Sequence, residues 1–151
     1  MFGAVGDTPY RIVLVLHILS ILVAFAPAFT HPLVVQQTQD LPDEASRRRL
    51  IGLLAGNGRR IYGPALIVAG IFGFALSGMS GGIYALSQGW LIASIIIWIA
   101  MNGLIHAVLV PAERAMAEGD DAARVRYDRA GPLTGILLLL MVVLMIFKPG
   151  A

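Results

Sequence analysis

A long apolar run with a histidine inside it constrains this chain more than any other feature. The run extends from Tyr10 to Pro32, reads YRIVLVLHILSILVAFAPAFTHP, and contains His17. An apolar run of this length predicts a membrane-spanning helix. An ionisable side chain in such a helix is costly against lipid, so His17 is expected to face other protein, in packing or in a functional site.

The composition indicates the same class of protein. Of the 151 residues, 58% are hydrophobic and 13% are charged, whereas a soluble domain averages about 25% charged residues. We therefore expect one all-α domain over residues 1–151, folded as a bundle of four transmembrane helices. The expected spans are residues 10–28, 62–79, 89–110 and 132–147, each with a proline at or near one end.

The distribution of positive charge predicts an orientation. Nine of the eleven basic residues lie in the connections between spans 1 and 2 and between spans 3 and 4, and the termini carry only Arg11 and Lys148. The positive-inside rule then places both connections in the cytoplasm and both termini outside, N-out and C-out. This pattern is typical of a multi-pass protein of the bacterial inner (cytoplasmic) membrane.

The connection between spans 1 and 2 carries helix signals of its own. Pro42 precedes Asp43 and Glu44, and Gly56 follows the leucine-rich part of the segment. A short interfacial helix is expected here, bound to the lipid bilayer through anionic headgroups, with a solvated connector as the alternative. The arginines facing those headgroups would be Arg47, Arg48 and Arg49. Basic residues elsewhere alternate with acids, so nucleic-acid binding is not indicated.

Small residues follow His17 at helical spacing, and span 2 carries a similar stripe. They are Ser20, Ala24 and Ala28 in span 1 and Gly70, Gly73 and Ser77 in span 2. Such faces let helices pack closely, and they can also leave room for a flat cofactor between helices. His17 is therefore a candidate axial ligand of haem b, with a hydrogen bond to a neighbouring helix as the alternative.

Two methionines and two further histidines are possible partners of His17. Met141 is expected at the depth of His17, with Met145 one turn nearer the outer boundary, as second axial ligands or as apolar filler. His17 is expected about 10 Å below the outer boundary and His106 about 15 Å deeper, too far apart to bind one metal between them. His31 is expected near His106, both as polar residues at the cytoplasmic interface.

Other polar residues are expected to serve packing. Asn102 is expected to hydrogen-bond another helix, with His106 one turn below it as a candidate partner. No acidic residue falls within the four expected spans, so a carboxylate proton relay is not indicated. The chain has no cysteine, which excludes disulfides and thiolate metal sites.

Four pieces of the chain, in order, resemble one group of membrane proteins. The run LHILSILVAFAPAFTHP resembles the first span of the HemJ-type protoporphyrinogen oxidases and the related CopD-like proteins. Its matching residues are His17, Phe25, Ala26, Phe29 and Pro32. The stretch RRIYGPALIVAGIFG, residues 59–73, is similar to the second span of that group. The start of its third span and its last span are matched by Trp90-Leu91 and by Arg129, Pro132 and Lys148-Pro149.

The resemblance implies a four-helix bundle with an outside amino terminus and a b-type haem held by His17. In the HemJ-type enzymes this haem accompanies the oxidation of protoporphyrinogen to protoporphyrin. Two positions depart from the pattern: Ser94 stands about where those enzymes carry a lysine, and Leu33 follows Pro32 where a basic residue is expected. By its place in that pattern, Ser94 is a candidate cofactor-binding residue. The chain is thus more similar to the uncharacterised integral membrane proteins of the group.

Three functions are compatible with these observations. The first is a haem-binding bundle with a redox or haem-related role, like that of a protoporphyrinogen oxidase. The second is a non-enzymatic membrane protein, packed as a homo-oligomer or as an accessory subunit of a larger membrane complex. The third is a small transporter of a metal or solute, by analogy with CopD-like proteins. Sparse methionines and the absence of acids in the expected spans count against it.

Overall fold

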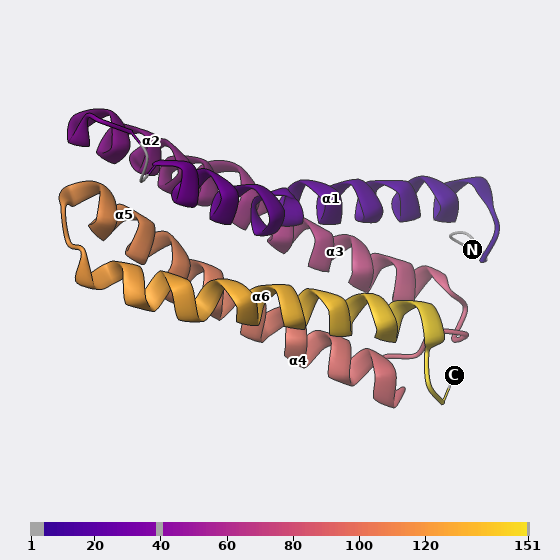
Figure 1. The fold of residues 1–151 in the computed structure, drawn as a ribbon. Coiled ribbons are helices and arrows are strands. Elements are labelled where there is room, and N and C mark those ends of the chain that lie inside the picture. The colour runs from indigo at the N-terminus through magenta and orange to yellow at the C-terminus, as the bar shows by residue number, and fades with distance from the viewer. Residues whose placement is uncertain (1–4, 39–40, 151) are drawn as a thin grey trace.

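The computed structural model describes residues 5–38 and 41–150, and every regular element in these ranges is helical. Four long helical rods lie side by side in an elongated bundle, each antiparallel to the next along the chain (Figure 1). The described parts of both termini lie at one end of the bundle, and the arginine-rich connections lie at the other. The predicted all-α class is confirmed.

Two of the four rods are single helices and two contain a π-helical turn. The single helices are α1 (Thr8–Gln37) and α6 (Ala122–Phe147). The second rod consists of α2 (Glu44–Asn57), the π-helical turn η2 (Gly58–Tyr62) and α3 (Gly63–Met79). The third consists of α4 (Gly89–Leu104), the π-helical turn η3 (Ile105–Leu109) and α5 (Val110–Glu118).

The helices continue past the prolines that were expected to mark their ends. Helix α1 contains Pro27 and Pro32 and runs on to Gln37, and α6 contains Pro132. Pro64 and Pro111 each stand in the first turn of the helix that follows a π-helical turn. A proline ring collides with the carbonyl one turn earlier and removes one backbone donor. A π-helical turn widens the backbone at that point, so both rods pass their prolines without ending.

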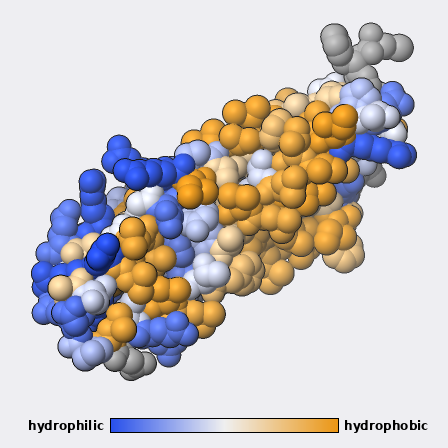
Figure 2. Space-filling view, turned by 90° about the horizontal axis from the view of Figure 1, so that it is seen from above, coloured by the Kyte–Doolittle hydropathy of each residue, from blue (hydrophilic) through white to orange (hydrophobic). Residues whose placement is uncertain are grey.

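The four rods meet the requirements for crossing a membrane by length and composition. They are Thr8–Gln37, Glu44–Met79, Gly89–Glu118 and Ala122–Phe147. Figure 2 shows a broad hydrophobic surface along the bundle and a large hydrophilic end. That hydrophilic end is the one at which α2 and α5 lie (Figure 1). This arrangement is compatible with a multi-pass membrane protein.

Helix α2 differs from the separate surface helix that the sequence led us to expect. Asp43 caps it, accepting hydrogen bonds from the Ser46 hydroxyl at 2.5 Å and from the backbone N–H groups of Ser46 and Ala45 at 3.0 and 3.1 Å. These bonds, that of the Ser46 hydroxyl above all, lower the pKa of the Asp43 carboxyl. Beyond the cap, α2 continues through η2 into α3 as one helix of 36 residues. This continuity gives no support to a helix lying flat on a membrane.

The packed core occupies the arginine-rich half and the middle of the bundle. One buried cluster, which includes Val35, Ile51 and Met116, joins α1, α2, α5 and α6. A second cluster, which includes Phe25 and Met101, joins α1, α3, α4 and η3. Toward the termini the four rods enclose a cavity instead of a filled core.

Gly70 allows the closest approach between α3 and α4, and its substitution should weaken the bundle. A Cβ atom added at Gly70 would overlap the indole of Trp98, whose Nε1 donates to the carbonyl of Leu66 at 2.8 Å. We expect Gly70→Ala to lower the free energy of unfolding by about 1–3 kcal/mol through overpacking. That loss exceeds the gain of about 1 kcal/mol in helix propensity. Unfolding of the protein in detergent measures the difference.

Gly103→Ala is the matched control for this prediction. It is also a helical glycine, but a Cβ added there meets no atom within 4 Å among the described residues. Its stability should equal or exceed that of the wild type. If Gly70→Ala proves as stable as Gly103→Ala, the close approach of Trp98 to α3 is wrong.

Candidate functional site

The cavity toward the termini is the main candidate site. It has a volume of about 410 Å³ and is lined by residues of α1, α3, α4 and α6 and of the connection between α3 and α4. Ligand sites are commonly clefts of about 300–1,000 Å³ with mostly apolar walls. The four residues predicted as cofactor ligands or neighbours all line this one cavity. They are His17, Ser94, Met141 and Met145.

His17 is held in one orientation by α3. Its Nδ1 lies 2.8 Å from the carbonyl oxygen of Ala69, and a Cβ added at Gly73 would lie 3.3 Å from its Cε1. A carbonyl oxygen only accepts hydrogen bonds, so Nδ1 carries the proton and donates it. The neutral ring then has its lone pair on Nε2. Metal-binding histidines are usually prepared in this way, with the other ring nitrogen donating to a carbonyl or carboxylate.

The wall opposite α3 is formed by α4 and α6. Ser94 is 2% exposed, and its hydroxyl donates to the carbonyl of Trp90 in the same helix at 2.8 Å. This bond uses the hydroxyl proton, so Ser94 offers the cavity only an acceptor. Met141 and Met145 are half-buried on α6, one turn apart. Their thioethers are soft donors that can bind iron or fill an apolar space.

Both tryptophans of the chain belong to the cavity wall. Trp98 donates from Nε1 to the carbonyl of Leu66 at 2.8 Å, and its ring meets Phe74 edge-on with centroids 6.1 Å apart. Trp90 donates to the side chain of Gln88 at 3.0 Å and meets Tyr84 edge-on at 5.9 Å. These bonds leave the indole faces as rigid apolar walls. Any flat ligand in the cavity lies near both rings.

A lysine lies at the terminal end of the same cavity. The Nζ atom of Lys148 donates to the hydroxyl of Tyr84 at 3.0 Å and lies 4.3 Å from the centre of the Tyr84 ring. Lys148 ends α6 in the left-handed conformation, with φ of +42°. Lys148 was not among the predicted site residues. Its spacing from Met141 and Met145, seven and three residues, places all three on one helix face and could have revealed it.

The polar residues predicted to serve packing lie elsewhere. His31 is 6% exposed and its Nδ1 lies 2.8 Å from Oε1 of Glu113. His106 is exposed, with its ring against Gly63. Asn102 donates from Nδ2 to the carbonyl of Trp98 at 2.9 Å, within its own helix. Its expected bond to another helix is not among the contacts of the described residues.

Glu113 is a site residue that the sequence analysis missed. The sequence predicts that the charged segment after Pro111 extends spans 3 and 4 as helices around a turn at Gly119, and it assigns no chemistry to that segment. In the structure the third rod continues to Glu118, and the Glu113 side chain is buried at 3% exposed. Glu113 lies outside the four expected spans, which contain no acid, but the bundle extends past those spans. Acids and bases alternate in this segment as in a solvated helix, and this pattern concealed the burial of Glu113.

Comparison with known proteins adds no functional information. No model of a known protein family, no curated protein and no solved structure matches the chain. Among the described residues, no group of three or more histidines and acidic residues could hold a metal ion. A metal bound at His17 would therefore need most of its ligands from outside the protein.

A porphyrin that occupies the cavity should quench nearly all the tryptophan fluorescence. The chain has two tryptophans, and Trp90 and Trp98 both line the cavity. Titration of the purified protein with protoporphyrin, followed by tryptophan emission, measures this.

The variant Ser94→Phe is the control for the site of binding. Ser94 is buried at the wall between the two indoles, so a phenyl ring there should fill the cavity and abolish the quenching. Tight porphyrin binding that leaves the tryptophan emission unchanged would place the ligand elsewhere.

Proposed function

We propose that this chain is a multi-pass protein of the bacterial inner (cytoplasmic) membrane, with both termini outside. Four rods of spanning length and an apolar surface between polar ends support the proposal. Nine of the eleven basic residues lie toward the end opposite the termini. Under the positive-inside rule this end would face the cytoplasm.

The arginines of α2 are proposed to meet the headgroups of that leaflet. Arg47 and Arg48 are each more than a third exposed and both lie close to Glu44. Exposed ion pairs of this kind contribute little stability, so the arginines can exchange Glu44 for an anionic lipid. Because α2 continues into α3, the arginines would reach the headgroups from the side of a helix that extends out of the membrane.

We further propose that the 410 Å³ cavity binds b-type haem through Nε2 of His17. The observation that carries this proposal is the bond from Nδ1 of His17 to the carbonyl of Ala69, which leaves the Nε2 lone pair available beside the cavity. A single histidine cannot hold a metal ion alone, but a porphyrin brings four nitrogen ligands of its own. Met141 and Met145 line the same cavity, and either thioether could supply a second protein ligand to the iron.

The other residues of the cavity fit an acidic, flat ligand. The apolar walls of α3, α4 and α6 exclude water, which strengthens electrostatic contacts inside. The ammonium of Lys148 and the hydroxyl of Tyr84 offer charge-assisted hydrogen bonds to a carboxylate, such as a porphyrin propionate. Bound haem would supply one-electron redox chemistry. The resemblance to protoporphyrinogen oxidases makes a porphyrinogen the first substrate to test, with Lys148 offering an ammonium group in the cavity that Ser94 also lines.

A non-enzymatic role in packing is the second candidate. It is favoured by the same bond between His17 and Ala69, because that bond by itself joins α1 to α3. Large apolar side chains on the surface, including Phe29 and Phe147, would then contact lipid or a partner protein in a homo-oligomer or larger complex.

The visible spectrum separates the two candidates. Protein purified in detergent from haem-replete cells should show a Soret band, and His17→Ala should lose it because iron loses its protein ligand. His106→Ala is the matched control, since His106 is exposed and lies outside the cavity. Of the variants Met141→Leu and Met145→Leu, only the one that removes a ligand of the iron should shift the Soret band.

A colourless wild-type protein, or a Soret band that survives in His17→Ala, would contradict haem binding at His17. The packing role predicts instead that His17→Ala lowers the stability of a colourless protein. Growth of a strain that lacks protoporphyrinogen oxidase tests the enzymatic role separately. Failure of the wild type to restore growth would remove that role and leave haem binding to the spectrum.

A further inference from the structure

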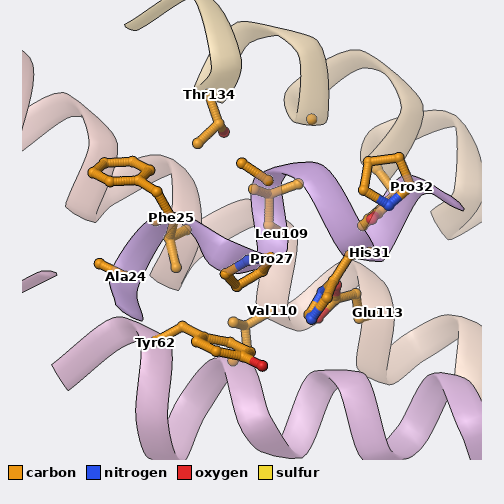
Figure 3. Close-up of a pocket in the computed structure, with 15 residues that line it drawn as sticks. Ala24, Phe25, Pro27, His31, Pro32, Tyr62, Leu109, Val110, Glu113 and Thr134 are labelled. Carbon is orange, nitrogen blue, oxygen red and sulfur yellow. The ribbon is translucent and has the colours of Figure 1, made fainter. Parts of the chain in front are cut away.

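A second, smaller cavity lies toward the arginine-rich end, apart from His17. Its volume is about 70 Å³, and His31, Tyr62, Glu113 and Thr134 contribute polar atoms to its lining. Figure 3 shows His31 and Glu113 side by side at this cavity, with Pro27 and Pro32 of α1 next to them. Nothing in the proposed haem site uses these residues.

His31 and Glu113 form a buried pair between α1 and α5. Their side chains are 7% and 4% exposed, and Nδ1 of His31 lies 2.8 Å from Oε1 of Glu113. The second carboxylate oxygen lies near Gly58, where an added Cβ would be 3.6 Å from it. The Tyr62 ring meets the His31 ring edge-on at 5.5 Å. A charged carboxylate in such surroundings is very costly unless it is paired or takes up a proton.

One nitrogen of the pair is left unsatisfied. Nε2 of His31 is buried and has no hydrogen-bond partner among the described residues. Leaving such a group unpaired costs about 1–3 kcal/mol. A buried water needs roughly 10–15 Å³ of cavity volume and two to four polar partners. The cavity of about 70 Å³ can therefore hold more than one water molecule. Nε2 of His31, the Glu113 carboxylate and the Thr134 hydroxyl can supply those partners.

Several irregularities of the helices converge on this cavity. Pro27 and Pro32 interrupt the hydrogen bonds of α1, and both line the cavity. The π-helical turns contribute Gly58 and Tyr62 from η2 and Ile105 and Leu109 from η3. Single π-helical turns inside helices occur frequently at functional sites. Helix packing alone does not require two prolines and two π-helical turns at one cavity.

We propose that His31 and Glu113 form a proton-exchange site served by water in the 70 Å³ cavity. Nε2 of His31 accepts a proton from a hydronium ion, which leaves as water. The proton on Nδ1 then passes to Oε1 of Glu113, which becomes a neutral carboxylic acid, and the ring regains a lone pair on Nδ1. One proton is bound in total, and the charge of the pair changes from −1 to zero.

The charges around the pair are few. Tyr62 faces it from η2, and Tyr127 of α6 lines the same cavity. His106 of η3 and the arginines Arg59 and Arg60 of η2 are exposed, so water or headgroups screen them. Within the described part of the chain, Glu113 and His31 are the only acid and imidazole lining this cavity. The site is independent of the proposed haem.

Infrared difference spectroscopy of the full protein in lipid vesicles tests the proposal. Spectra are recorded between about pH 4 and 9, the range in which carboxyl and imidazole groups titrate. We expect the C=O band of a buried carboxylic acid to appear as the pH falls and to shift in heavy water, which shows exchange with solvent. Glu113→Gln should remove this band. Glu118→Gln is the matched control, because Glu118 is exposed on the same helix.

His31→Gln separates a proton-exchange pair from a structural one. Without the imidazole, no ring nitrogen can take a proton from the cavity water and pass it on, so the exchange of the Glu113 carboxyl proton with heavy water should slow or stop. If one of the two variants fails to fold, the other still decides the question, because both should change the same band. A wild-type protein with no carboxylic acid band across the range, or with a band that does not respond to heavy water, would overturn the proposal.

Discussion

Polar side chains inside an apolar bundle must find partners within it, and this fold depends on a few such pairs. The bond from His17 to the carbonyl of Ala69 joins α1 to α3. The bond from Trp98 to the carbonyl of Leu66 joins α4 to α3. The pair of His31 and Glu113 joins α1 to α5. In a medium that offers no competing water, such bonds fix how the helices pack against each other.

The two halves of the bundle use these bonds differently. In the arginine-rich half, buried apolar side chains of α1, α2, α5 and α6 fill the interior, and the cavity beside His31 has room only for small molecules. In the terminal half, Trp98 of α4 packs on Gly70 and His17 of α1 packs on Gly73, so α1 and α4 both contact α3 through a ring. The space between them is therefore hollow. Of the two cavities described, the larger lies in the terminal half, where His17 lies.

Much of this organisation could be predicted from the sequence. The apolar runs predicted four long helices. His17 and Met141 were expected at a common depth, and both line the larger cavity. The hollow itself could not be predicted, because it depends on how the Trp98 and His17 rings lie across Gly70 and Gly73.

Two of the misplaced helix ends share a physical cause. The π-helical turns let the chain pass Pro64 and Pro111 as helix, whereas α1 and α6 contain their prolines without such a turn. The burial of Glu113 was missed for another reason, since its segment alternates acids and bases as a solvated helix does. Residue type alone also does not give the partner of Asn102, which bonds its own helix. Such details depend on rotation about the helix axis, which a short periodic pattern determines poorly.

The protonation of the His17 ring is the most direct test of the account. Nitrogen-15 magnetic resonance of labelled histidine in lipid nanodiscs distinguishes the two ring nitrogens, and His17→Ala assigns the signals among the three histidines. We predict a proton on Nδ1, a lone pair on Nε2, and a change in the Nε2 signal when haem is added. A proton on Nε2, or His17 signals that haem leaves unchanged, would contradict the central claim.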